Sequence, residues 1–103
     1  MDTCLITLSG TCKTKPHVLS SGRVSFIVEC NNSVKSGPFH VIVMAEAAAV
    51  SVMPAAGDYI IVSNASYYDD TRAGARFGVY ASCAGTVNIA AHYDGAIPAE
   101  TLL

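Results

Sequence analysis

Short apolar runs, each bounded by residues that favour turns, are the feature that most restricts what this chain can fold into. Apolar and polar residues alternate in residues 4–11 and again in residues 23–31. In the second run Val24, Phe26 and Val28 share one face of an extended chain. A period of two is typical of β-strands that bury one face and expose the other. These runs therefore predict a protein built mainly from β-strands.

Three more strands and one helix are expected from the rest of the chain. The further strands are residues 39–46, residues 58–66 and a fifth strand that begins at residue 76, and a short continuation after Gly85, as far as residue 91, is left open. Residues 46–54 contain helix-forming alanines and end at Pro54, so they predict a helix of about two turns. The tail at residues 92–103 has no clear period, and we expect it to be ordered only by contact. A length of 103 residues then predicts one domain, residues 1–91, followed by this tail.

The expected order of these elements predicts a particular barrel. Three strands, a helix and two more strands form the order of the OB-fold. We therefore expect an all-β, five-stranded Greek-key OB-fold barrel with one short helix between strands 3 and 4. Ligands of this fold bind across the face of strands 2 and 3, between the loops L12 and L45. In this chain L12 corresponds to residues 13–22 and L45 to residues 67–75.

Charged residues are few, but they are unevenly distributed. They make up 14% of the chain and the formal net charge is −2, which taken alone argues against strong binding of nucleic acid. The basic residues are Lys13, Lys15, Arg23, Lys35, Arg72 and Arg76. The first four fall in the first third of the chain and the last two in a second segment, and the expected fold gathers these two segments, which contain L12 and L45, into one positive stripe. Asp69 and Asp70 also lie in L45, where they repel phosphate and can neutralise Arg72.

No common catalytic or metal-binding motif is present in the sequence. It lacks an H-x-E…C-x-x-C pattern, a G-x-S-x-G turn and a P-loop lysine motif, so we expect neither an enzyme nor a bound cofactor. His17, His40 and His92 are too widely spaced to indicate a zinc site, and no metal is expected.

Cysteine usage and hydropathy indicate a cytoplasmic protein. The cysteines have irregular spacings without a C-x-x-C pair, which favours reduced and mostly buried thiols. The N-terminus lacks the basic and apolar regions of a signal peptide. No apolar run approaches the roughly 18 residues of a membrane span, so we expect no membrane association.

Three segments within residues 5–89 carry a resemblance to a known family. They are ITLSGTCKTKPHVLSSGRVSFIVE, FHVIVMAEAAAVSVMPAAGDYIIVSNAS and RFGVYASCAGTVNI. In their order and spacing they resemble bacterial single-stranded DNA-binding proteins, and the start LSGTCKT also resembles primosomal replication protein N, a dimeric relative of similar length. The resemblance implies binding of single-stranded DNA in replication, recombination or repair, by a homodimer or homotetramer.

Two departures from that family limit what the resemblance implies. The chain has no tryptophan, the residue that usually stacks bases in the family. The sequence also ends without a long Gly-, Gln- and Pro-rich linker and without an acidic tip. We therefore do not expect the recruitment of partner enzymes that depends on such a tail.

Aromatic and basic side chains are the candidate ligand contacts. Each base stacked on an aromatic ring contributes about 1–3 kcal/mol, with little sequence preference. Phe39 and Phe77 can instead pack inside the barrel. Tyr67 and Tyr68 are adjacent, so in a strand they point to opposite faces and at most one belongs to the core. The expected nucleic-acid-binding residues are Lys13, Lys15, Arg23, Lys35, Phe39, Tyr67, Tyr68, Arg72, Arg76 and Phe77, and Tyr80 is a further aromatic candidate.

Two functions from different classes fit the sequence. The first is non-catalytic binding of single-stranded DNA with little sequence preference, and RNA is not distinguished from DNA. The second is an OB-fold module for oligomerisation or protein interaction that has lost nucleic-acid binding, which the missing tryptophans and the net charge favour. A homo-oligomer is expected in both cases, because an apolar barrel with few charges leaves edges and patches to cover.

Overall fold

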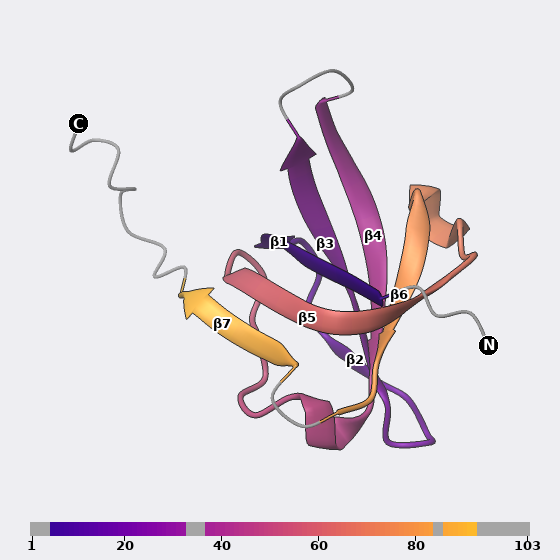
Figure 1. Cartoon of the computed structure of the whole chain (residues 1–103). Helices are drawn as coiled ribbons and strands as arrows, with labels where there is room; N and C mark the ends of the chain where they lie inside the picture. Colours follow the sequence, from indigo (N-terminus) through magenta and orange to yellow (C-terminus); the bar gives the residue numbers. More distant parts are fainter. Residues whose placement is uncertain (1–4, 33–36, 84–85, 93–103) are drawn as a thin grey trace.

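The alternating runs of the sequence form strands in the computed structural model, which describes residues 5–32, 37–83 and 86–92. The strands are β1 (Leu5–Cys12), β2 (His17–Val18), β3 (Val24–Asn32), β4 (Gly37–Ala45), β5 (Tyr59–Tyr68), β6 (Phe77–Ala81) and β7 (Val87–Ala91) (Figure 1). Two single turns of 3-10 helix, η1 (Ala47–Ala49) and η2 (Arg72–Gly74), interrupt the connections. Lys35 and the tail from residue 93 onward, for which the sequence made predictions, lie outside the described residues.

Five of these strands close into a barrel. The hydrogen-bonded order is β1-β3-β4-β6-β5, and β5 pairs back with β1. The β4–β6 pair is parallel, whereas the other pairs of the barrel are antiparallel. Because β5 precedes β6 in the chain but lies beyond it in the sheet, the barrel has the expected Greek-key connection. The predicted OB-fold barrel is therefore confirmed.

The barrel interior is filled by the alternate residues that the sequence pattern predicted to share one face. On β3 the side chains of Val24, Phe26 and Val28 are buried, while their neighbours are more exposed. The other strands contribute similar sets, and the largest fully buried aliphatic side chains are Val28, Val41, Val43, Ile60, Val62, Val79 and Val87. Burial of each such side chain contributes about 1.5–3 kcal/mol.

The prediction of a helix at residues 46–54 is wrong. Only η1 forms there, and its N-cap residue Glu46 makes no capping hydrogen bond with its side chain. Directly after η1 the chain extends, and Val50 forms a parallel bridge with Val87 of β7. Helix propensity is a weak prior, and here the pairing of a β-branched residue with a neighbouring strand overrides it.

The predicted fifth strand is β6, and the continuation after Gly85 that the sequence left open forms a separate strand, β7. β6 pairs with the second half of β5, where Tyr67 lies opposite Val79. β7 pairs with the first half, where Ile60 lies opposite Ile89. A bulge on β5 with Asn64 at a φ of 51° separates the two halves, and such a bulge bends the strand. Because of this bend, β5 can pair with both β6 and β7 along the same edge.

The thiols that the structure describes are unpaired, as the sequence predicted. Cys12 and Cys30 are buried free cysteines, and Cys83 is exposed. Burial raises the pKa of the Cys12 and Cys30 thiols above the ordinary value, so both stay protonated and unreactive near neutral pH. Among the described residues, no helix has both the length and the apolar character needed to cross a membrane.

We predict that Gly10→Ala destabilises the barrel. A Cβ atom at Gly10 would lie 2.3 Å from the Glu29 carbonyl oxygen and 2.8 Å from Val28 Cγ1. The first atom belongs to the backbone of β3, so relief requires β1 and β3 to move apart. The expected loss is about 1–3 kcal/mol of unfolding free energy, measured by urea denaturation. The control is Ser66→Ala at an exposed position of β5, and equal stability of the two variants would contradict the prediction.

Candidate nucleic-acid interface

Loops L12 and L45 face each other across the outer surface of β3 and β4. Between them lies a hollow of about 310 Å³. Its walls are His17 and Leu19 from L12 and Arg72 and Ala73 from L45, and its floor is Ser25, Ile27, Ile42 and Met44. The barrel therefore brings together L12 and L45, the two loops that the sequence predicted to flank the ligand-binding face.

A second hollow continues this surface across β4, β6 and β5. It has a volume of about 410 Å³ and shares Met44 and Arg72 with the first hollow. Its other lining residues are Arg23, Ser66, Tyr67, Tyr68 and Tyr80. We call the two hollows together the groove.

The apolar floor of the groove comes from the face of β3 and β4 that points away from the core. Ile27 lies directly opposite Ile42, and Ser25 lies opposite Met44. Their neighbours in the sequence, such as Val41 and Val43, fill the barrel. Sequence reasoning treated residues 39–46 as one continuous apolar run and did not single out Ile42 and Met44. The alternation within that run was the signal that could have found them.

Arg72 is held by Asp70 at the point where the two hollows meet. The guanidinium Nε donates to Asp70 Oδ1 at 3.0 Å, and Nη2 donates to Oδ2 at 2.7 Å. The backbone N–H of Arg72 also donates to Oδ1, at 3.1 Å. The Arg72 side chain lowers the pKa of the Asp70 carboxyl to about 2. The neutralisation of Arg72 by Asp70, which the sequence raised as an objection, is present in the structure.

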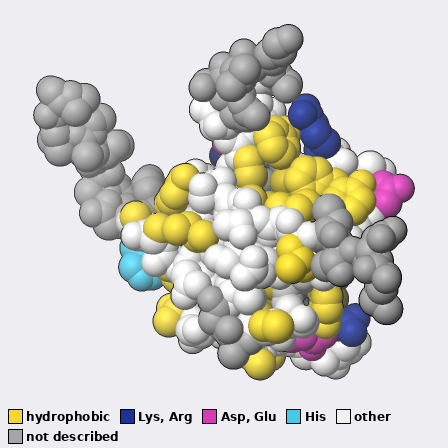
Figure 2. Space-filling model, in the orientation of Figure 1, with side chains coloured by type: hydrophobic (Ala, Val, Ile, Leu, Met, Phe, Trp, Pro, Cys, Tyr) yellow, Lys and Arg dark blue, Asp and Glu magenta, His cyan; other side chains and the backbone are white. Residues whose placement is uncertain are grey.

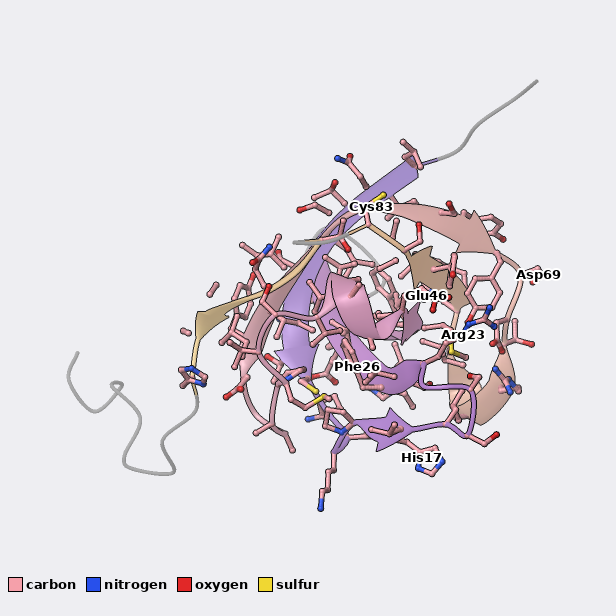
Figure 3. All side chains as sticks on the ribbon, turned by 90° about the horizontal axis from the view of Figure 1, so that it is seen from below. His17, Arg23, Phe26, Glu46, Asp69 and Cys83 are labelled. Atoms are coloured by element: carbon pink, nitrogen blue, oxygen red, sulfur yellow. The ribbon has the colours of Figure 1, made fainter. Side chains whose placement is uncertain are left out.

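Arg23 is engaged by a carboxylate from the end of β4. Its Nε donates to Glu46 Oε2 at 2.9 Å, and its guanidinium carbon lies 5.6 Å from the centre of the Tyr80 ring. Figure 3 shows Arg23 and Glu46 side by side. The Tyr80 hydroxyl donates to the same oxygen of Glu46. This bond and then the hydrogen bond from Arg23 lower the pKa of Glu46, and the hydrogen bond to the Glu46 carboxylate raises the pKa of Tyr80.

Lys13 is the third basic residue that faces a carboxylate. Its Nζ lies 3.8 Å from Glu29 Oε1, and His40 Nε2 lies 3.4 Å from the other oxygen of Glu29. Glu29 and His40 are opposite each other on the outer face of β3 and β4. Lys15 lies in L12 and is exposed. The predicted positive stripe is therefore largely charge-balanced, because Lys13, Arg23 and Arg72 are each paired with an acid.

Three of the expected aromatic residues gather at the open end of the barrel. The ring centre of Phe77 lies 6.3 Å from that of Phe39 and 5.6 Å from that of Tyr67. Arg76 covers the cluster, with its guanidinium 4.7 Å from the centre of the Phe39 ring. In Figure 2 hydrophobic side chains gather over the ends of β4 and β6, with a basic side chain beside them. Phe39 and Phe77 are half-buried against the core, and Tyr67 is 47% exposed.

Tyr68 takes the face opposite to Tyr67, as adjacent strand residues must. Its ring lies over Gly78, where an added Cβ atom would be 2.6 Å from the ring. Burial, and then the charge of Asp70, raise the pKa of the Tyr68 hydroxyl. Tyr68 thus forms part of the groove wall, while Tyr67 reaches both the groove and the aromatic cluster.

The described residues offer no group of three or more His, Cys, Asp or Glu side chains that could hold a metal ion. The groove instead combines an apolar floor, tyrosine rings and guanidinium groups. These groups can stack on planar rings and donate hydrogen bonds to anions.

The closed barrel and its groove between L12 and L45 define an OB-fold protein. A solved structure of similar shape is that of the small single-stranded DNA-binding protein from Streptomyces coelicolor. The TM-score is 0.58 at 20% sequence identity, and the match covers 86% of this chain and 94% of that one. At this identity the likeness establishes a shared fold. No protein-family model matches the chain, and no curated protein matches it in sequence.

The ion pair between Asp70 and Arg72 leads to a prediction about the stability of the fold at acid pH. Because the folded-state pKa is about 2 and the ordinary value is 3.8, the pair stabilises the fold above the ordinary pKa. That contribution is lost as the pH falls from about 4 towards 2. We expect wild type to be more stable than Asp70→Asn near neutral pH, and this difference to shrink over the acid range in urea denaturation.

The matched control for this experiment is Asp69→Asn. Asp69 is exposed and points away from the barrel at the edge of L45 (Figure 3). The substitution removes the same charge one residue away. A stability difference between wild type and Asp70→Asn that does not change with pH would contradict the assignment.

Proposed function

We propose that this protein binds single-stranded DNA in the groove, without catalysis and with little sequence preference. The observation that carries the proposal is the continuous groove over the outer face of β3 and β4, flanked by L12 and L45. This is the surface on which OB-folds bind oligonucleotides. The Streptomyces coelicolor protein, which shares the fold, is itself a single-stranded DNA-binding protein.

The groove suits bases better than it suits a dense row of phosphates. Its floor of Ile27, Ile42 and Met44 offers an apolar surface, and its tyrosines offer planar rings. Stacking is tolerant of sequence because every base has a π-face. Arg72, with a side chain that is 72% exposed, stands between the two hollows and can donate to a phosphate.

The remaining expected contacts extend the site beyond the groove. Lys13 lies on the same outer face, Arg23 lines the groove, and Lys15 lies in L12. Phe39, Phe77 and Arg76 form the cluster at the open end of the barrel, which Tyr67 connects to the groove. We propose that a strand leaving the groove passes over this cluster. RNA remains the alternative ligand, and a role in replication, recombination or repair is part of the proposal.

A second candidate function is an oligomerisation or interaction module. The observation that favours it is a set of exposed large apolar side chains, Leu5, Val52, Met53, Tyr59 and Ile61. We propose that a second copy covers some of this surface, giving a homodimer or homotetramer. Light scattering combined with an oligo-dT gel shift separates the two candidates. A stable oligomer that does not shift oligo-dT supports the second, and a monomer at high concentration contradicts the expected oligomer.

We predict that Met44→Glu weakens binding of oligo-dT by about tenfold or more. The new carboxylate would lie on the apolar floor that both hollows share and would repel the phosphates of a bound strand. Binding is measured by quenching of tyrosine fluorescence at low salt, and circular dichroism reports whether the variant folds.

The matched control is Ala90→Glu. Ala90 is an exposed residue of β7 that lies outside the lining of the groove and outside the exposed apolar set named above. The substitution introduces the same charge, and the variant should bind like wild type. Equal weakening by both substitutions would show that net charge matters and the groove does not. A folded wild-type protein that ignores oligo-dT at low salt would refute the proposed function.

A further inference from the structure

The basic residues of the groove already have acidic partners in the free protein. Arg23 is paired with Glu46 and Arg72 with Asp70. The second pair stands out by its burial, because the Asp70 side chain is only 7% exposed whereas that of Arg72 is 72% exposed. The carboxylate therefore lies beneath the guanidinium, on the side away from solvent.

Asp70 engages the Nε and Nη2 atoms of the Arg72 guanidinium, while the Arg72 side chain as a whole stays 72% exposed. Its oxygens accept from Nε and Nη2 at distances from 2.7 to 3.2 Å. An arginine has five N–H donors, so an exposed guanidinium that is paired with one carboxylate still has donors for a ligand. Arg72 can still bind a phosphate, but it does so as half of a neutral pair.

We propose that Asp70 is a specificity-determining residue of the groove. Asp70 disfavours ligands that bind by charge alone, and the groove therefore prefers single-stranded DNA to duplex DNA. This inference rests on the proposed function. By neutralising Arg72, Asp70 weakens the attraction for any polyanion. A single strand recovers binding free energy by stacking its bases on the groove. A duplex keeps its bases paired and offers mainly phosphates to a surface of this kind, so the loss of electrostatic attraction affects it more.

The backbone around Asp70 indicates that this residue can be changed without reshaping L45. The Asp70 Oδ1 atom accepts from the Arg72 backbone N–H, and the amide oxygen of asparagine can make the same bond. Asp70→Asn therefore removes the charge and keeps the local turn. Asp69→Asn, at an exposed neighbouring position, changes the net charge by the same amount.

The test measures binding of oligo-dT and of a duplex of the same length to wild type, Asp70→Asn, Asp69→Asn and the double variant Asp70→Asn/Arg72→Gln. Affinities are determined over a range of salt concentrations by fluorescence anisotropy of labelled DNA. We expect Asp70→Asn to bind oligo-dT about two- to fivefold more tightly than wild type at low salt. The gain in affinity of this variant for duplex DNA should be larger, so its preference for single-stranded DNA should be smaller than that of wild type.

The salt dependence gives a second readout. One additional unpaired cation should steepen the slope of log K against log salt concentration by about 0.7 for oligo-dT and by about 0.9 for duplex. Asp69→Asn should change the slope and the preference little. The double variant should lose the increase in DNA affinity that Asp70→Asn shows, because that increase acts through Arg72.

Three other outcomes would overturn the inference. If wild type binds oligo-dT but Asp70→Asn binds more weakly, Asp70 only orients Arg72 and does not set specificity. If Asp69→Asn gains as much as Asp70→Asn, net charge explains the effect and the inference again fails. If wild type and all variants ignore oligo-dT, the proposed function itself fails, and the inference fails with it.

Discussion

The pairing of β1 with both β3 and β5 is the constraint on which the rest of the structure depends. β1 runs along β5 from Leu5 to Thr11, and its end crosses onto β3 at Thr11 and Cys12. The crossing requires close approach of the backbones at Gly10. Because this pairing closes the barrel, it also fixes the curvature of β3 and β4, whose outer face forms the floor of the groove. The shape of the groove therefore depends on the close contact that β1 makes with β3 at Gly10.

Much of this architecture could be predicted because strand patterning is local. The alternation of Val24, Phe26 and Val28 identified both a strand and its buried face, and the positions of the turns identified the loops that flank the groove. The helix was mispredicted because the alanines of η1 are followed by Val50, whose bridge to Val87 joins residues far apart in the sequence. The continuation after Gly85, which the sequence left open, is a separate strand for a similar reason, since β6 and β7 pair with different halves of the bent β5.

The electrostatics of the site could be predicted only where the partners are neighbours. Asp70 and Arg72 are two residues apart, and their pairing was visible in the sequence. Arg23 and Glu46 meet only because β3 and β4 are aligned, and Tyr80 joins them from β6. Glu46 is the first residue of the helix that was predicted and did not form, and its carboxylate contacts Arg23 and Tyr80 instead of capping η1.

The closure of the barrel also has a consequence for how the chain reaches its folded state. Ser66 of β5 must find Leu5 of β1, and Phe77 of β6 must find Val41 of β4. Pairings over such sequence separations place the barrel among the topologies of high contact order, which fold in about milliseconds to seconds. β3 and β4 follow each other in the sequence and pair along their length, but the tyrosines of β5 and β6 join them through these distant pairings. The complete groove therefore forms only when the long-range pairing of the barrel is in place.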